Sequence, residues 1–374
     1  MITCEPRMPA YDAALKQAVQ PGSHVIDIGA GTGIFSLLAC KYGAAQVTAI
    51  EPADEVLLTR DLAVANGCDD RITVMQGLST NHVTAQKADV IVSDIRGTMP
   101  LFEHHIATIV DARERLLAPG GTLIPMRDTI RAVLVNAPDE YKHVTDPWIN
   151  NRYDLDLTAG YRYAANNMFK VYVEPDAMVS DVQVWAVLDY RTISDPNMVA
   201  KVTLTPIGDV TAHGLLLWFD AELAEGIGYS NAPGEPKLVY GQSFLPFEHL
   251  VTVSADDRVE AEVKASLVDG GYVWSWTTSI YRGAAQRPET VFRQSTFKSQ
   301  VLSPASLAKK TGQHVPPPSP KHQIDMALLS LIDGTRTMTQ IADQLRSRFP
   351  QAVPTAKAAL DLVATAVGRY DENG

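Results

Sequence analysis

Cysteine is scarce in this sequence, which has three (Cys4, Cys40 and Cys68) in 374 residues. Their spacing offers neither a disulfide framework nor a paired metal-ligand motif, so we expect a protein of the reduced cytoplasm. Apolar runs long enough to span a bilayer are missing, and the first residues lack the basic flank and apolar stretch of a signal peptide. We therefore expect no membrane partner.

Positive charge is also in deficit, with 32 Lys and Arg against 43 Asp and Glu and a net charge of −11. Phosphate backbones require a basic surface, so we expect no nucleic-acid partner. An acidic surface is compatible with a cationic substrate, although solubility alone explains it equally well. The length and the 46% hydrophobic content allow two or three domains with buried cores.

Within residues 1–135, strand-like and helix-like runs alternate. Apolar runs at 25–28, 47–50, 72–75 and 90–92 indicate buried strands, and helical spacing separates them. The last helix of this region is expected at 106–117, before Pro119. Such alternation predicts an α/β fold with a parallel, Rossmann-like sheet.

The pattern changes from residue 136 to about residue 300, where short alternating strands such as "VQVWAVLDY" are separated by turn residues such as "DGG". This predicts an antiparallel, β-barrel-like domain for substrate binding or dimerisation. Four tryptophans of this region are expected in its core: Trp185, Trp218, Trp274 and Trp276. Residues 301–320 are predicted to be a proline-rich linker, because "HVPPPSP" cannot continue a helix. Residues 321–374 are predicted to form a small helical domain.

A glycine-rich turn follows the first predicted strand in "VIDIGAGTGIF". Glycines at this place let the backbone approach a ligand, and the start of the next helix supplies amide donors. A dinucleotide fingerprint would need glycine at position 34, where this chain has Ile34. The spacing from Asp27 through Gly29, Gly31 and Gly33 instead resembles the first motif of class I S-adenosylmethionine (SAM) methyltransferases. That resemblance implies SAM as the cofactor, with Glu51 on its ribose hydroxyls.

Further segments resemble the protein arginine methyltransferase family, as a divergent member of bacterial type. These are "MITCEPRMPAY" at the start, "MQGLS" at 75–79 and "DARERLLAPGGTLIP" at 111–125. The resemblance implies that Arg7 grips the cofactor carboxylate. It also favours a homodimer. The residues it implies for cofactor binding are Arg7, Tyr11, Asp27, Gly29, Ala30, Gly31, Gly33, Glu51, Pro52, Leu78, Ser79 and Asp94.

The loop "SDIRGTMPLFEHH" follows the fourth predicted strand, where that family carries two glutamates nine residues apart. The matching residues here are Asp94 and Glu103, which implies that they position or deprotonate the methyl acceptor. Asp94 is one methylene, about 1.5 Å, shorter than the family's glutamate. Arg96 departs from the pattern, and the family's later Thr-His-Trp loop is replaced by "KLVYGQSF", in which Tyr240 can wall a substrate slot.

Arg96 leaves the acceptor open. It would repel a substrate guanidinium or neutralise Glu103, it could bind a substrate carboxylate, or it could form a structural ion pair with Glu103. The sequence therefore predicts methyl transfer to a polar atom, foremost a guanidino or amino nitrogen, of a peptide, protein or small molecule. The alternatives are an O- or N-methyltransferase of ribosomal-peptide biosynthesis with a carboxylate-bearing substrate, and an inactive SAM- or peptide-binding protein.

Two further features of the sequence are a pair of adjacent histidines and a segment near the C-terminus. His104 and His105 are adjacent, and adjacent side chains on a helix point about 100° apart, so we predict no metal site. The segment "LLSLIDGTRTMTQIADQL", residues 328–345, weakly resembles the winged-helix peptide-binding modules called RiPP recognition elements. That resemblance implies a domain that docks a peptide as an added strand.

Overall fold

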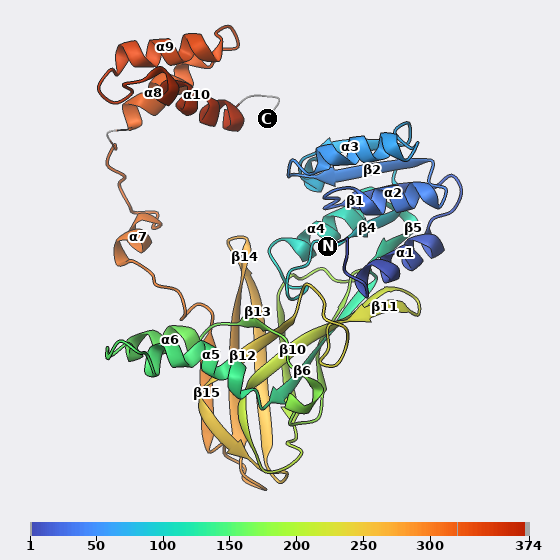
Figure 1. Ribbon diagram of the computed structural model, residues 1–374, viewed down its shortest axis with the longest axis vertical. Helices are drawn as coiled ribbons and strands as arrows, with labels where there is room; N and C mark the ends of the chain where they lie inside the picture. Colours follow the sequence, from blue (N-terminus) through green and yellow to red (C-terminus); the bar gives the residue numbers. More distant parts are fainter. Residues whose placement is uncertain (1, 320, 371–374) are drawn as a thin grey trace. The chain divides into compact units, whose positions relative to one another are not determined.

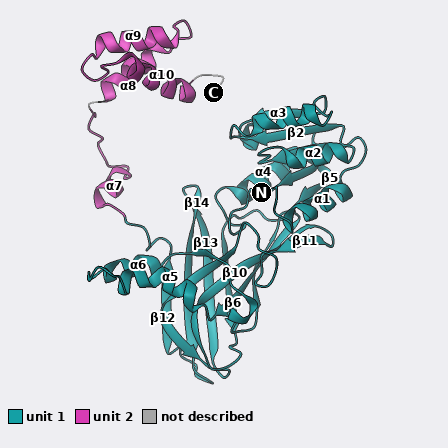
Figure 2. Cartoon of the chain, in the orientation of Figure 1, with its two compact units in different colours: residues 1–301 teal, residues 302–374 magenta. Residues whose placement is uncertain are grey.

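The computed structural model describes residues 2–319 and 321–370. The chain forms two compact units, residues 1–301 and 302–374 (Figure 2). Pro320 of the predicted linker and residues 371–374 of the predicted helical domain lie outside the described residues.

The first unit begins with a five-stranded parallel sheet in the order β3-β2-β1-β4-β5 (Figure 1). Its strands are β1 (His24–Ile28), β2 (Gln46–Glu51), β3 (Ile72–Gln76), β4 (Ala88–Ser93) and β5 (Leu117–Ile124). All five residues of β1 are buried, as expected for a central parallel strand that is covered on both faces. The predicted Rossmann-like sheet is confirmed.

Helices connect these strands: α1 (Arg7–Ala18), α2 (Ile34–Lys41), α3 (Val56–Ala65) and α4 (His105–Asp111), with the short 3₁₀ turn η1 (Ser79–Asn81) after β3. The helix predicted at 106–117 ends earlier. It stops as an α-helix at Asp111 and continues as the π-helical turn η2 (Ala112–Leu116). Leu117 is already in β5, so the sequence placed this end one residue too late.

The strand order reverses beside β1, which pairs in parallel with β2 on one side and with β4 on the other. In open α/β sheets, ligands bind at such a switch point, beyond the carboxyl ends of the strands. Gly29 follows β1 there, and Asp94 follows β4. The glycine turn and the loop of residues 93–105, which is predicted to meet the methyl acceptor and is called the acceptor loop below, therefore lie at the same edge of the sheet.

Antiparallel sheets make up the rest of the first unit. One has the order β7-β12-β10-β6-β8 with β11 against β10, and the other has the order β15-β14-β13-β9. The strands are β6 (Arg127–Val135), β7 (Phe169–Val171), β8 (Gln183–Asp189), β9 (Met198–Leu204), β10 (Val210–Ala224), β11 (Ile227–Ser230), β12 (Gln242–Val253), β13 (Arg258–Val268), β14 (Gly271–Tyr281) and β15 (Thr290–Ser295). The four tryptophans predicted for the core are all buried. The antiparallel β-domain is confirmed.

Two helices, α5 (Pro138–Ile149) and α6 (Thr158–Ala165), pack together between β6 and β7, and the 3₁₀ turn η3 (Pro175–Ala177) follows β7. The Tyr141 and Tyr161 hydroxyls of these helices are 2.8 Å apart. Gly160 lies against Trp148, because a Cβ at Gly160 would be 2.0 Å from the indole Cε3. The pair is therefore held by its own side chains.

The second unit contains α7 (Pro304–Lys309), α8 (His322–Leu331), α9 (Met338–Arg348) and α10 (Ala356–Tyr370). Helix α7 lies inside the range predicted as linker. The last three helices enclose a small core that includes Leu328, Leu345 and Val363. Thr337 and Gln340 form a capping box at the start of α9. Among the helices of residues 2–319 and 321–370, none has the length and apolar character needed to cross a bilayer.

Candidate functional site

Two cavities open at the switch point, and Gly29 lines both of them. The first has a volume of about 490 Å³ and the second about 400 Å³. Both volumes are within the range of small-molecule sites. Because they meet at the glycine turn, a ligand with two chemically different ends can occupy them together.

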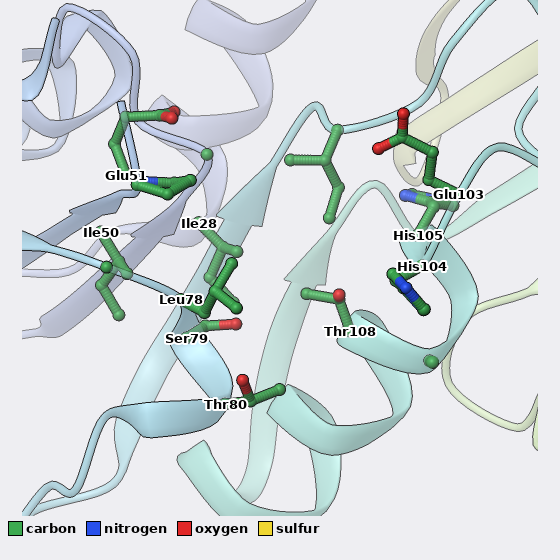
Figure 3. A pocket seen from close by; sticks show the side chains of 15 residues that line it. Ile28, Ile50, Glu51, Leu78, Ser79, Thr80, Glu103, His104, His105 and Thr108 are labelled. Atoms are coloured by element: carbon green, nitrogen blue, oxygen red, sulfur yellow. The ribbon is translucent and has the colours of Figure 1, made fainter. Parts of the chain in front are cut away.

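The first cavity is bounded by β1, β2, the turn after β3 and the acceptor loop. Figure 3 shows Glu51 and Glu103 on opposite sides of it, with Ile28 and Leu78 between them. Apart from its two histidines, the ionisable groups in its lining are these two carboxylates, and the lining contains no Lys or Arg. The cavity thus has an apolar middle and acidic ends, which favours a cationic ligand.

Backbone conformation and lack of space explain why the turn after β1 contains glycines. Gly29 has φ +73°, and a Cβ there would lie 2.3 Å from Ile95 Cγ2 at the start of the acceptor loop. Gly33 has φ +78°, and a Cβ there would lie 2.3 Å from Thr59 Cγ2 of α3. Only glycine satisfies both the left-handed backbone and the lack of space at these positions.

Asp27 supports this turn from below. Its side chain is fully buried, and one carboxylate oxygen accepts hydrogen bonds from the Ser36 amide (3.0 Å) and hydroxyl (2.7 Å) at the start of α2. Burial raises the pKa of Asp27 to about 7, although the two Ser36 hydrogen bonds oppose the shift. Asp27 lines neither cavity, so it acts on the turn rather than on a ligand directly.

Glu51 ends β2 at the rim of the first cavity. Its two carboxylate oxygens accept hydrogen bonds from the Gly31 amide and the Ala53 amide, each at 3.1 Å. These bonds fix the carboxylate between the glycine turn and the segment after β2. Each carboxylate oxygen can accept a further hydrogen bond, so Glu51 at the cavity lining is suited to accept from a pair of ligand hydroxyls.

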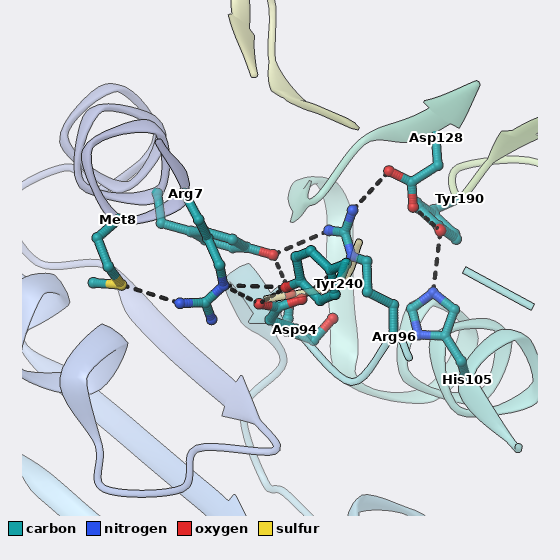
Figure 4. A network of polar contacts seen from close by, with 10 residues as sticks. Arg7, Met8, Asp94, Arg96, His105, Asp128, Tyr190 and Tyr240 are labelled. Atoms are coloured by element: carbon teal, nitrogen blue, oxygen red, sulfur yellow. Dashed lines mark hydrogen bonds and ion pairs between the residues drawn. The ribbon is translucent and has the colours of Figure 1, made fainter. Parts of the chain in front are cut away.

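A buried ionic cluster lies where the acceptor loop leaves β4 (Figure 4). The Asp94 carboxylate pairs with the Arg7 guanidinium on one oxygen, which also accepts from the Tyr240 hydroxyl at 2.6 Å. The other oxygen lies 3.3 Å from Arg96 Nε. The Asp94 side chain is 2% exposed and the Arg96 side chain is fully buried. Two arginines of the chain therefore share this one acid.

The cluster continues into the antiparallel domain. Arg96 Nη1 donates to Asp128 at 2.7 Å, and the Tyr190 hydroxyl donates to the other Asp128 oxygen. His105 Nε2 lies 3.1 Å from the same Tyr190 oxygen. Since the Tyr190 proton goes to Asp128, His105 Nε2 has to donate here. One hydrogen-bonded chain thus connects both ends of the acceptor loop to the β-domain.

Burial and charge set the protonation of this cluster. Burial would lower the pKa of Arg96, but Asp128 and other neighbours more than offset it, so the pKa is raised. Burial raises the pKa of Asp128, and the charge of Arg96 opposes that shift. Burial, helped by Arg96, lowers the pKa of His105 to about 3, so this imidazole is neutral at physiological pH.

The structure divides the predicted site residues into three sets. The first cavity is lined by Gly29, Glu51, Pro52, Leu78, Ser79 and Glu103. The second cavity is lined by Arg7, Gly29, Ala30, Gly31 and Asp94. Neither cavity is lined by Tyr11, Asp27, Gly33, Arg96 or Tyr240.

The structure places Arg96 and Tyr240 in the interior, and the ion pair considered for Arg96 and Glu103 is not formed. Arg96 pairs with Asp94 and Asp128, not with Glu103, and its buried side chain offers nothing to a substrate carboxylate. Tyr240 is 5% exposed, its hydroxyl donates to Asp94, and it lines neither of the two cavities. Both side chains belong to the contacts that join α1, the loop start and the antiparallel domain.

Tyr11 is also an interior residue. It is fully buried, stacks on Phe35 with ring centroids 4.4 Å apart, and donates to the Ser93 carbonyl at 3.0 Å. Its ring lies 5.1 Å from the Arg7 guanidinium carbon. Tyr11 can therefore hold Arg7 in place, but it does not line either cavity.

Sequence reasoning missed Asp128, Tyr190 and the interior role of His105. Asp128 had a detectable signal, because in "RDTIRAVLV" it alternates with Ile130 and Ala132 on the buried face of β6. A carboxylate on such a face requires a cation or donors. Tyr190 and His105 had no comparable signal. In the part of the chain that the structure describes, no group of three or more His, Cys, Asp or Glu is placed to hold a metal ion.

The sequence and the fold of this chain are similar to those of known methyltransferases. The family model "Ribosomal protein L11 methyltransferase (PrmA)" matches residues 13–126. The probable protein arginine N-methyltransferase 6 of Arabidopsis thaliana is 29% identical over 233 residues, which are 60% of this chain and 53% of that protein. Protein arginine N-methyltransferase 1 of Dictyostelium discoideum is 24% identical over 277 residues, 72% of this chain and 81% of that protein. The chain thus spans about half of the first of these relatives.

Solved structures share the fold. The Trypanosoma brucei PRMT1 enzyme-prozyme heterotetrameric complex with AdoHcy matches with a TM-score of 0.72 at 21% identity, over 79% of this chain and 96% of that chain. Arabidopsis thaliana protein arginine methyltransferase 10 matches with a TM-score of 0.70 at 21% identity, over 79% and 95%. The parallel sheet followed by the antiparallel sheets is therefore an architecture of arginine methyltransferases. In sequence and fold, this chain is similar to the protein arginine methyltransferases, a resemblance that the sequence predicted, and residues 13–126 match a methyltransferase family model.

Proposed function

We propose that this protein transfers a methyl group from SAM to a nitrogen of a peptide, protein or small-molecule acceptor. The observation that carries the proposal is the first cavity, in which two carboxylates face each other across an apolar middle without any Lys or Arg in the lining. Glu51 belongs to the predicted cofactor side and Glu103 to the acceptor side. A sulfonium and a basic nitrogen are both cationic, so both ligands suit this lining.

The residues present fit the cofactor. Leu78 and Ser79 border the end of the cavity near Glu51, where an adenine ring and its ribose would be held. Gly31 has open space around its α-carbon, which leaves room for a ligand against the turn. Arg7 lines the adjoining cavity and would hold the carboxylate of the amino-acid part. When bound, SAM supplies an electrophilic methyl group.

Glu103 is the residue that we assign to the acceptor. It lies in the loop in a left-handed backbone conformation with φ +41°, which costs a non-glycine residue roughly 1–2 kcal/mol. The strained backbone places the carboxylate at the cavity lining. There it can orient an acceptor nitrogen and accept its proton, as a positioned general base does.

The two alternatives fare differently. A carboxylate-bearing substrate would need a free cation at the acceptor side, and the Arg96 guanidinium is buried between Asp94 and Asp128. The geometry therefore gives no support to that alternative. Turnover distinguishes the other alternative, an inactive SAM- or peptide-binding protein, from an enzyme.

Titration calorimetry with S-adenosylhomocysteine tests the cofactor part. We expect one binding site in the wild type, an affinity at least tenfold lower for Glu51→Gln, and an affinity within a few-fold of wild type for Glu103→Gln. Glu103→Gln is the matched control, since it removes the other carboxylate of the same cavity. Absence of binding to the wild type would refute the methyltransferase proposal.

Assembly and peptide docking are further parts of the proposal. We propose a homodimer, to which the α5–α6 pair and the antiparallel sheets offer surface. Light scattering on the purified chain measures this directly, and a monomer at micromolar concentration would contradict it.

For residues 321–374 we propose a peptide-docking role, in keeping with the exposed apolar side chains Met326 and Leu329 on α8. Crosslinking a peptide acceptor to this unit would support that role.

A further inference from the structure

The chain keeps two of its own guanidinium groups on the first acid of the acceptor loop. We propose that the acceptor is therefore an alkylamine, such as a lysine side chain or an α-amino group, and not a guanidine. In this proposal Asp94 is an internal counter-ion and Glu103 is the single acid that meets the acceptor. The inference rests on the proposed methyl transfer and names its substrate class.

Asp94 already faces two cations and one hydroxyl of the chain itself. Arg7 and Tyr240 both donate to one of its oxygens, and Arg96 Nε lies 3.3 Å from the other. The cluster contains two guanidinium groups (Arg7 and Arg96) and two carboxylates (Asp94 and Asp128), so its formal charges sum to zero. A third cation at Asp94 would leave a net positive charge in a buried site, which is unfavourable.

Arg96 stays with Asp94 when a cofactor engages Arg7, although the cluster then has one guanidinium for its two carboxylates. If Arg7 turned toward a cofactor carboxylate, Asp94 would still be paired with Arg96. The Arg96 guanidinium cannot follow a substrate, because it is fixed from several sides. Asp128 accepts from it at 2.7 Å and the Tyr11 hydroxyl at 3.0 Å.

Aromatic rings complete the enclosure of Arg96. The guanidinium carbon lies 5.5 Å from the ring centroid of Phe219 and 5.7 Å from that of Tyr229. Two carboxylates, a hydroxyl and two ring faces are the groups by which proteins recognise guanidinium. The place that would bind a guanidinium at the start of this loop is thus filled by the chain itself.

Glu103 differs from Asp94 in each of these respects. Its side chain is exposed and lines the first cavity. Its carboxylate has no hydrogen bond or ion pair with any residue within 2–319 and 321–370. An acceptor nitrogen in this cavity therefore meets one free carboxylate.

One carboxylate is sufficient for an amine and insufficient for a guanidine. Methyl transfer needs a neutral nitrogen with a free lone pair. The pKa of a lysine-type amine is about 10.4 and that of a guanidinium is about 12.5 or more, so at neutral pH the amine has at least about a 100-fold larger neutral fraction. The guanidinium charge is also delocalised over three nitrogens, and localising a lone pair on one of them calls for a second anion.

The step balances with Glu103 alone. The ammonium loses one proton to the Glu103 carboxylate, and the resulting amine lone pair forms the new C–N bond as the C–S bond of the sulfonium donor breaks. That bonding pair stays on sulfur, which becomes a neutral thioether. The nitrogen carries the positive charge and the methyl group, and Glu103 releases its proton to water.

The test uses the full chain, radiolabelled SAM and two random-sequence, N-acetylated peptide pools that differ only in lysine or arginine at one fixed position. We expect label in the lysine pool at least tenfold faster than in the arginine pool, recovered as N-methyl-lysine after acid hydrolysis. A third pool with a free α-amino group and neither residue extends the comparison to terminal amines.

The controls separate two kinds of failure. Glu103→Gln should lose the label while it retains S-adenosylhomocysteine binding by calorimetry. If the wild type binds S-adenosylhomocysteine but labels the arginine pool at an equal or higher rate, the amine inference is wrong. If it binds S-adenosylhomocysteine and labels none of the pools, the proposed transfer to peptide nitrogens is wrong together with the amine inference. If the wild type fails to bind S-adenosylhomocysteine, the proposed function itself is wrong.

Discussion

Asp94 and Glu103 stand nine residues apart on one loop and have opposite surroundings. Asp94 is buried, accepts from Arg7 and Tyr240, and faces Arg96. Glu103 is exposed at the cavity and has no partner among the described residues. The same spacing in a sequence can thus hold one acid that neutralises the protein's own charges and one that is left for a ligand. The difference comes from Arg96 and Asp128, which the spacing of the two acids does not reveal.

Removal of the free acid should have the largest effect. We expect Glu103→Gln to lower the rate of methyl transfer by about 10²–10⁴-fold, because a positioned general base contributes that much. Its thermal stability should stay at the wild-type value, since the carboxylate has no hydrogen bond or ion pair with the residues that the structure describes. Label transfer and a thermal melt on the same sample measure both quantities. Wild-type activity of this variant would show that Glu103 has no part in methyl transfer.

Removal of the buried cation should act on stability instead. Arg96→Met leaves Asp128 buried without its cation, and breaking a buried pair in this way costs about 3–5 kcal/mol. The matched variant Arg96→Met with Asp128→Asn removes both charges, and we expect it to recover most of that loss. Urea denaturation of the three proteins gives the comparison. If Arg96→Met were as stable as wild type, the cluster would not hold the loop.

The glycine turn offers a matched pair of smaller changes. Gly33→Ala would place a Cβ 2.3 Å from Thr59 Cγ2 in a left-handed backbone, so we expect a loss of about 2–4 kcal/mol. Gly31→Ala has the same kind of backbone but open space, so only about 1 kcal/mol of backbone strain is expected. Denaturant midpoints distinguish the two. Equal losses would mean that crowding at Thr59 has no role.

Replacement of His105 should have the smallest effect, which is a change in how the stability of the protein depends on pH. The pKa of His105 is about 3 in the folded protein and about 6.5 when unfolded, so the unfolded state binds an extra proton between these values. Stability should be complete above pH 6.5 and fall as the pH drops below it. At pH 5.5 the loss relative to pH 7.5 is about 1.4 kcal/mol. His105→Asn cannot titrate, so its stability should fall by that much less over the same interval, as urea titrations at both pH values would show.

Much of the fold could be predicted from the sequence, because it depends on local signals. The buried apolar runs of β1 and β4 predicted a parallel sheet, and the alternating β-strands with their tryptophans predicted the antiparallel domain. The positions of Glu51 and Glu103 at the cavity could also be predicted from the sequence, since the carboxyl ends of parallel strands meet at one edge of the sheet. The predicted helix 106–117 ends one residue too late, and the sequence did not reveal that its last turn, Ala112–Leu116, is π-helical.

The different surroundings of Asp94 and Glu103 could not be predicted from the sequence. They depend on contacts between residues far apart in the chain, such as Arg7 with Asp94 and Arg96 with Asp128. The sequence showed a guanidinium inside an acidic loop and suggested Glu103 as its partner. Only the packing of β6 against the loop start shows that Asp128 takes that place.

The most direct measurement is the ratio of lysine-pool to arginine-pool methylation in wild type and in the variant Arg96→Met with Asp128→Asn. In this variant Arg96 no longer neutralises Asp94, which can then face the acceptor once Arg7 holds the cofactor carboxylate. We expect the ratio to be at least tenfold in favour of lysine in wild type and to fall several-fold in the variant. An unchanged ratio in a folded, SAM-binding variant would contradict the claim that Arg96 reserves Asp94 and thereby selects the acceptor.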